Sequence, residues 1–126
     1  MDGAINDFIN PPAQNRIVPF WFWNGDMDRE TIKKQLWQMK EKGLGGVFIC
    51  ARQGLGIPYL SQKWFDTVKF ASKTAEEYGL NVWLYDEYPY PSGMSGGEVM
   101  LRHPEAEHTV LQLKTYEISG GDIDIK

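Results

Sequence analysis

The sequence has little cysteine, little histidine and no excess of positive charge. Its 126 residues include one cysteine, Cys50, which cannot form a disulfide within the chain and lies in an apolar run, so we expect a small core residue. The formal net charge is -4. Such a chain offers no broad attraction to nucleic acid or to an anionic membrane, because both bind basic surfaces. We therefore expect neither as a partner, and neutral or cationic ligands are favoured.

The sequence also lacks a long hydrophobic run. Residues 1–7 contain neither the basic segment nor the apolar stretch of a secretory signal, and no later stretch is long enough to span a bilayer. These absences predict a cytoplasmic protein.

No metal or nucleotide motif is present. His103 and His108 are five residues apart, whereas two metal ligands that share a helix face are commonly four apart. The glycine-rich stretches at 43–46 and 92–97 lack the spacing and the Lys-Ser/Thr ending of phosphate-binding loops. We expect no metal and no cofactor.

Aromatic residues are plentiful instead. They make up 13% of the chain and include 5 tryptophans, within a composition that is 42% hydrophobic and 24% charged and typical of one soluble globular unit. A chain this short has a limited interior in which to bury large rings. We expect some of them to line a ligand pocket or an interface.

Three apolar runs alternate with two amphipathic stretches. The predicted strands are residues 17–23, 46–51 and 81–85, and the predicted helices run from Asp26 or Asp28 to Gly43 and from Ser61 to Gly79. This order predicts right-handed βαβ units and a parallel sheet, which makes the fold class α/β. Residues 1–16, with their two adjacent prolines, are expected to form a lead-in segment.

The last part of the chain breaks this pattern. Residues 109–118 and 122–126 alternate apolar and polar side chains around a Ser-Gly-Gly turn, which predicts a β-hairpin. We expect residues 106–126 to be the start of a β-rich insertion and the whole chain to be a fragment. The alternative is a small complete α/β domain that forms homo-oligomers to cover an exposed apolar edge.

Several blocks in the same order resemble one enzyme family. They are Pro19-Phe-Trp-Phe-Trp-Asn-Gly25, Gly43-Leu-Gly-Gly-Val-Phe-Ile49, Gly54-Leu-Gly-Ile-Pro-Tyr59, Ser61-Gln-Lys-Trp-Phe65, and Val82-Trp-Leu-Tyr-Asp-Glu87 followed by Pro91-Ser-Gly-Met-Ser-Gly-Gly97. Together they are similar to the amino-terminal barrel segment of α-L-rhamnosidase-like glycoside hydrolases of the family 106 type, over residues 8–105.

The resemblance implies a large carbohydrate-active enzyme with a catalytic (β/α)8 TIM barrel and β-rich modules inserted into it or following it. Such a barrel takes about 250 residues, so residues 17–105 would be its amino-terminal part, with the first three βα units. The remainder of the barrel, beyond Lys126, would then be a partner of this segment. In such barrels the catalytic acid and base are expected on later strands, outside this chain, so the fragment alone is expected to be inactive.

Two carboxylates follow the third predicted strand. Asp86 and Glu87 come where this strand leaves the core, and ligands bind at the carboxyl ends of parallel strands. Because successive side chains point to opposite faces of a strand, the two acids cannot face each other across a scissile bond. We therefore expect them to bind or orient a sugar. The alternative is that they cap the following loop or pair with Arg52.

The same edge is predicted to carry other sugar-binding groups. Alternation puts Trp21 and Trp23 on one face of the first strand and Phe20 and Phe22 on the other, and Trp23 is nearest the strand's end. The predicted substrate-binding residues are Trp23, Asn24, Arg52, Asp86, Glu87, Tyr88 and Tyr90. Aromatic faces suit the apolar face of a pyranose ring, and the polar groups would bond its hydroxyls.

Each of these assignments has a structural alternative. The four rings of the first strand could all be core, Arg52 could be a solvated loop residue, and the tyrosines could simply close the barrel end. For the function, the main hypothesis is hydrolysis of glycosidic bonds on a carbohydrate substrate. Its rival is a non-catalytic carbohydrate-binding or scaffold barrel.

Overall fold

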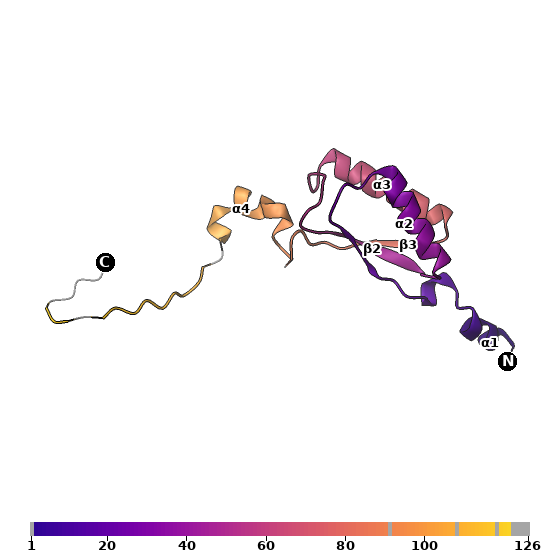
Figure 1. Cartoon of the computed structure of the whole chain (residues 1–126), viewed down its shortest axis with the longest axis horizontal. Coiled ribbons are helices and arrows are strands. Elements are labelled where there is room, and N and C mark those ends of the chain that lie inside the picture. Colours follow the sequence, from indigo (N-terminus) through magenta and orange to yellow (C-terminus); the bar gives the residue numbers. More distant parts are fainter. Residues whose placement is uncertain (1, 91, 108, 118, 122–126) are drawn as a thin grey trace.

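The computed structural model describes residues 2–90, 92–107, 109–117 and 119–121. Its elements, in chain order, are α1 (Asp2–Ile9), η1 (Ala13–Asn15), β1 (Phe20–Trp23), α2 (Arg29–Glu41), β2 (Gly46–Ala51), α3 (Gln62–Glu77), β3 (Asn81–Leu84), η2 (Ser95–Gly97), α4 (Glu98–Arg102) and η3 (Pro104–Ala106). Figure 1 shows a sheet with two helices on one side. The two ends of the chain extend away from this unit in opposite directions.

The three strands form one parallel sheet in the order β1-β2-β3. Phe20 pairs with Phe48 between β1 and β2, and Phe48 pairs with Trp83 between β2 and β3. The predicted α/β fold, with three parallel strands that alternate with helices, is confirmed.

Helices α2 and α3 cover one face of this sheet (Figure 1). The side chains buried between the helices and the sheet are Trp21, Trp23, Val47 and Ile49 from the strands and Ile32, Leu36, Trp64, Ala71 and Ala75 from the helices. Burying a large apolar side chain contributes about 1.5–3 kcal/mol, so this layer is the main source of stability.

Each covering helix begins at a side-chain cap. The Asp28 carboxylate accepts hydrogen bonds from the Thr31 N–H at 2.9 Å and from the Thr31 hydroxyl at 2.6 Å, and these bonds hold the pKa of Asp28 below its ordinary value. The Ser61 hydroxyl accepts from the Trp64 N–H at 3.2 Å. Of the two residues predicted to cap the first helix, Asp26 and Asp28, the structure shows Asp28 as the cap.

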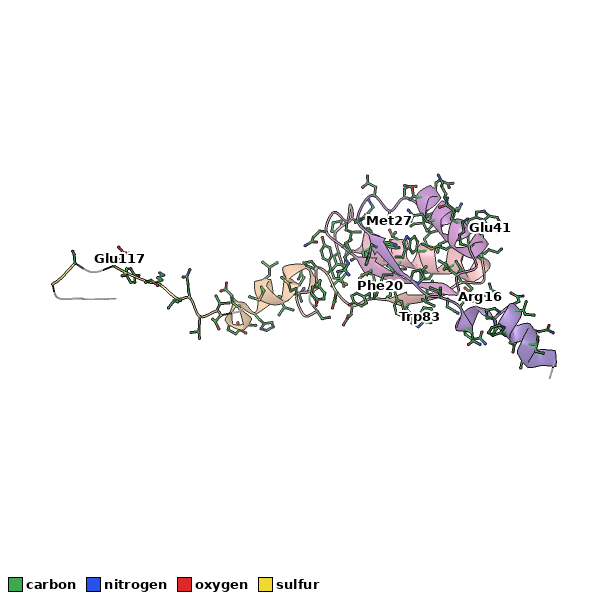
Figure 2. The ribbon with its side chains drawn as sticks, turned by 60° about the horizontal axis from the view of Figure 1, so that its bottom comes forward. Arg16, Phe20, Met27, Glu41, Trp83 and Glu117 are labelled. Atoms are coloured by element: carbon green, nitrogen blue, oxygen red, sulfur yellow. The ribbon has the colours of Figure 1, made fainter. Side chains whose placement is uncertain are left out.

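The other face of the sheet is aromatic, and no helix of the described residues covers it. We call the set Phe20, Phe22, Phe48, Trp83 and Tyr85 the open face. Phe20, Phe22 and Trp83 are 51%, 48% and 41% exposed. The Phe20 ring lies 5.0 Å from the Tyr85 ring, and the Phe48 ring lies 5.3 Å from the Trp83 ring. Figure 2, which brings the lower side of Figure 1 forward, includes Phe20 and Trp83 on this side.

Cys50 also belongs to the open-face side of β2, as the partner of Phe22 in the register. It is fully buried, as expected for a core residue. Burial raises the pKa of its thiol.

The amino-terminal segment contains structure that its composition did not predict. α1 is an eight-residue helix with Phe8 and Ile9 exposed, and it is followed by η1. η1 packs against the amino-terminal end of β2, where the Ala13 carbonyl lies over Gly45 so closely that no side chain would fit. The lead-in residues therefore lie against the amino-terminal end of β2.

The predicted hairpin lies partly outside the described residues. Residues 109–117 and 119–121 form no strand, and its second arm, residues 122–126, is not described, so the pairing stays a prediction. The short helices α4 and η3, which precede this segment, were not predicted from the sequence.

Among the helices of the described residues, none combines the length and the apolar character needed to cross a membrane.

Gly46 offers a test of the strand pairing. A methyl group there would clash with the Asn81 carbonyl oxygen and lie 2.8 Å from the Trp83 ring. We expect Gly46→Ala to lower the free energy of unfolding by about 1–3 kcal/mol, the usual cost of overpacking a core. Gly25→Ala is the matched control, because a methyl at Gly25 meets nothing within 4 Å. Urea unfolding followed by circular dichroism measures both, and equal stability of the two variants would contradict the pairing of β2 with β3.

Candidate active site

The three strands end at one edge of the sheet, which we call the rim. The Arg52 N–H donates to the Trp23 carbonyl at 3.0 Å, and the Tyr85 N–H donates to the Ile49 carbonyl at 2.9 Å. Asn24 lies against the same edge, since a side chain at Gly54 would come within 2.9 Å of its carbonyl oxygen. The residues that follow the three strands are therefore neighbours, as parallel topology requires.

Glu87 is the buried acid of the rim. Its side chain is 6% exposed, its Oε1 accepts a hydrogen bond from the Ser92 hydroxyl at 2.6 Å, and its Oε2 is buried without a partner in the described residues. A buried carboxylate oxygen without a donor is costly and therefore uncommon. Glu87 thus has one oxygen held in place and one with unused capacity to accept a hydrogen bond.

Glu87 belongs to the open-face side of the sheet. Burial raises the pKa of Tyr85, and the neighbouring Glu87 carboxylate raises it further, because its negative charge opposes tyrosinate. Burial also raises the pKa of the Cys50 thiol, the Arg52 charge lowers it, and the Glu87 charge raises it. The upper end of the open face therefore joins a carboxylate, a phenol and a guanidinium.

Asp86 lies on the other side of the strand end. It is exposed, and its charge, second to burial, raises the pKa of Tyr59 in the loop between β2 and α3. The two adjacent acids therefore lie in different surroundings, Asp86 exposed and Glu87 buried. They do not form a pair across one bond.

Arg52 points over the open face. Its guanidinium carbon lies 4.8 Å from the centre of the Phe22 ring. Among the described residues Arg52 forms no ion pair, so the alternative in which it neutralises Asp86 or Glu87 is not observed. Stacking on a ring leaves the N–H donors at the edge of the guanidinium available to a ligand.

Trp23 occupies a different place from the other predicted site residues. It is fully buried under the helices, with its ring centre 5.3 Å from that of Trp64. Alternation along β1 sends Trp21 and Trp23 to the helix-covered face and leaves Phe20 and Phe22 on the open face. We therefore leave Trp23 out of the sugar contacts proposed below, and Phe22 replaces it as the aromatic residue nearest the rim.

The remaining predicted residues lie around the rim. Asn24 and Tyr90 are exposed, and Tyr88 is half-buried with its ring centre 4.8 Å from that of Tyr59. The peptide bond between Tyr88 and Pro89 is cis. Sequence reasoning missed Ser92, although its place five residues after Glu87, in a turn-forming stretch, is a signal that could have found it.

Within the described part of the chain, no group of three or more metal-binding side chains comes together.

The Tyr85 phenol provides a test of the buried acid. Replacing Glu87 by Gln removes the negative charge beside the phenol, so tyrosinate forms more readily and the pKa of Tyr85 should fall toward its ordinary value. Titration followed by NMR of ring-labelled tyrosine measures this shift. Glu105→Gln, an exposed acid beside His103, is the control and should leave Tyr85 unchanged. A pKa of Tyr85 that does not move in Glu87→Gln would show that the two groups do not interact.

Comparisons with known proteins identify the family of the chain. A family model described as alpha-L-rhamnosidase matches residues 9–98, which include the whole sheet, both covering helices, Glu87 and Ser92. A protein of Formosa agariphila that is named as a beta-glucuronidase is 30% identical over an alignment of 96 residues, and the match covers 71% of this chain and 8% of that relative. No solved structure matches the chain. The chain belongs to glycoside hydrolase family 106, the alpha-L-rhamnosidase family.

Proposed function

We propose that the chain is part of a glycoside hydrolase that acts on α-L-rhamnosides. In this proposal it supplies the first three βα units of a (β/α)8 barrel and one wall of the sugar site. The observation that carries the proposal is the buried Glu87 carboxylate, which lies with Arg52 at the carboxyl end of three parallel strands and on the face away from the helices.

Barrel closure is supported by the exposure of the open face. Parallel sheets are found almost only with both faces covered, yet Phe20, Phe22 and Trp83 are 41–51% exposed here. Leu84, on the outer strand β3, is 60% exposed as well. Five further strands would enclose the rings of the open face as the interior of a barrel, and a further helix would cover Leu84.

The rim residues have the chemistry of a sugar-binding wall. In this proposal the Oε2 of Glu87, which is buried and unpartnered in the chain by itself, becomes accessible to a sugar hydroxyl in the complete site, and Arg52 donates to a ring or hydroxyl oxygen. Phe22 presents an aromatic surface beside them. Asn24, Asp86, Tyr88 and Tyr90 add polar and aromatic groups around the edge. These groups bind and orient the sugar.

The proposal assigns the chemical step to residues outside this chain. Glycosidases use two carboxyl groups about 5–9.5 Å apart on opposite sides of the bond. Glu87 has no such partner among the described residues, because Asp86 is adjacent and faces the other way. The general acid that protonates the leaving oxygen, and its partner carboxylate, then come from later strands of the barrel.

A second candidate is hydrolysis of an acidic sugar. The relative named as a beta-glucuronidase shares 30% identity, and the unpaired guanidinium of Arg52 is a group that binds a sugar carboxylate. The two nearby acids favour a neutral sugar, so the rhamnoside remains the first choice.

Kinetics on the protein encoded by the complete gene test the proposal. We expect hydrolysis of an aryl α-L-rhamnoside, and we expect Arg52→Gln and Glu87→Gln each to raise KM by roughly 10- to 100-fold, because each removes a charge-assisted hydrogen bond to the sugar. Lys69→Gln, on the exposed side of α3, is the control. Thermal melts verify that each variant is folded.

Three results would overturn parts of this account. If both rim variants keep the wild-type KM, then Arg52 and Glu87 do not bind the sugar. Hydrolysis by residues 1–126 alone, at the rate of the complete protein, would move the catalytic acids into this chain. Turnover of an aryl β-D-glucuronide in preference to the rhamnoside would select the second candidate.

A further inference from the structure

The turn at residues 92–97 is attached to the chain that leaves β3 at two points. The Ser92 hydroxyl donates to Glu87 Oε1 at 2.6 Å, and the Gly96 N–H donates to the Tyr88 carbonyl. Gly96 also lies against the Tyr88 ring, since a methyl group there would be 3.2 Å from it. The second attachment joins backbone atoms, so the path of the turn does not depend on the Ser92 hydroxyl alone.

The bond from Ser92 matters more to Glu87 than to Ser92. Ser92 is exposed, whereas the Glu87 side chain is 6% exposed. An exposed serine hydroxyl can form its hydrogen bonds with water, but a buried carboxylate oxygen needs a donor from the protein. Ser92 therefore satisfies the acid, and the acid is not needed to satisfy Ser92.

Glu87 has no other side-chain donor among the described residues. Arg52 forms no ion pair with it, and Oε2 has no partner. The length of the Ser92 bond is that of a hydroxyl bonded to a carboxylate, about 2.5–2.7 Å, which is a strong type of hydrogen bond. Its buried position strengthens it further, because the surroundings have a low dielectric constant.

This single bond limits where both oxygens of Glu87 lie. The two oxygens belong to one planar carboxylate, so a bond that holds Oε1 also restricts Oε2. A glutamate side chain that is free to rotate loses conformational entropy when it is fixed by a ligand. A side chain that is already held loses less, which favours binding.

We infer that Ser92 is a positioning residue of the sugar site, which holds Glu87 by Oε1 and leaves Oε2 directed at the place of a sugar hydroxyl. The inference rests on the proposed function of Glu87, and it gives Ser92 no contact with the sugar. Loss of the Ser92 hydroxyl then weakens substrate binding more than it slows the chemical step.

Kinetics of the complete protein with an aryl α-L-rhamnoside test this role. We expect Ser92→Ala to raise KM about five- to tenfold and to change kcat by less than about twofold, because Glu87 binds the sugar and does not take part in bond cleavage. Ser92→Thr keeps the hydroxyl and should keep the wild-type KM. Ser95→Ala, which removes another hydroxyl from the same turn, is the matched control. A wild-type KM in Ser92→Ala would overturn the inference.

A double-mutant cycle separates positioning of Glu87 from a general effect on the turn. Glu87→Ala removes both oxygens, so a further Ser92→Ala substitution in that variant should change KM by less than about twofold. Thermal melts verify that each variant is folded. If Ser92→Ala raises KM equally in the wild type and in Glu87→Ala, then Ser92 does not act through Glu87 and the inference is wrong.

The Tyr85 phenol tests the same bond without a substrate. Without Ser92 the Glu87 carboxylate should turn toward water, because a buried charge without a donor is costly. Burial raises the pKa of Tyr85 and the Glu87 charge adds to it, so this pKa should fall in Ser92→Ala and stay unchanged in Ser95→Ala. NMR titration, as for Glu87→Gln, measures both.

This titration also separates the inference from the proposed function. A pKa of Tyr85 that does not fall in Ser92→Ala would overturn the inference, whether or not the complete protein hydrolyses a rhamnoside. If the pKa falls but no rhamnoside is hydrolysed, the proposed function fails, and Ser92 still positions Glu87.

Discussion

The whole arrangement depends on the alternation of side chains along three parallel strands. On β1 this alternation sends Trp21 and Trp23 under the helices and Phe20 and Phe22 to the opposite side. β2 and β3 follow the same rule in register, so one face is a helix-covered core and the other is a continuous aromatic surface. The two faces have different tasks: the first stabilises the unit, and the second is available to a barrel interior.

The same constraint determines the chemistry at the rim. Where β3 ends, Glu87 is buried and its charge raises the pKa of Tyr85, while Asp86 is exposed and its charge raises the pKa of Tyr59. The hydrogen bond from Ser92 holds Glu87 and ties the loop that follows to the sheet. The next residue, Tyr88, places its ring against Tyr59, so the same stretch of chain also contacts the β2–α3 loop.

The regular part of the fold was predictable because periodicity carries it. Apolar runs marked the strands, Asp26 or Asp28 marked the start of the first helix and Ser61 that of the second, and the parallel sheet followed from their order. The short helices α1, α4 and η3 have no comparable repeat over enough residues. The sequence also did not define which side chains of β1 face the helices, because Trp and Phe are both large and apolar. Only packing against the helices decides which pair is buried. The bond from Ser92 to Glu87 depends on the path of a loop, which residue type alone does not define.

A crystal structure of the complete protein with L-rhamnose bound would show whether the open face lines a barrel and whether the rim binds the sugar. The account predicts that the rings of Phe20, Phe22 and Trp83 lie inside a closed barrel and that the sugar sits at the rim, with a hydroxyl bonded to Glu87 and Arg52 beside it. A structure in which these rings face solvent, or in which the sugar binds on the helix side of the sheet, would contradict it.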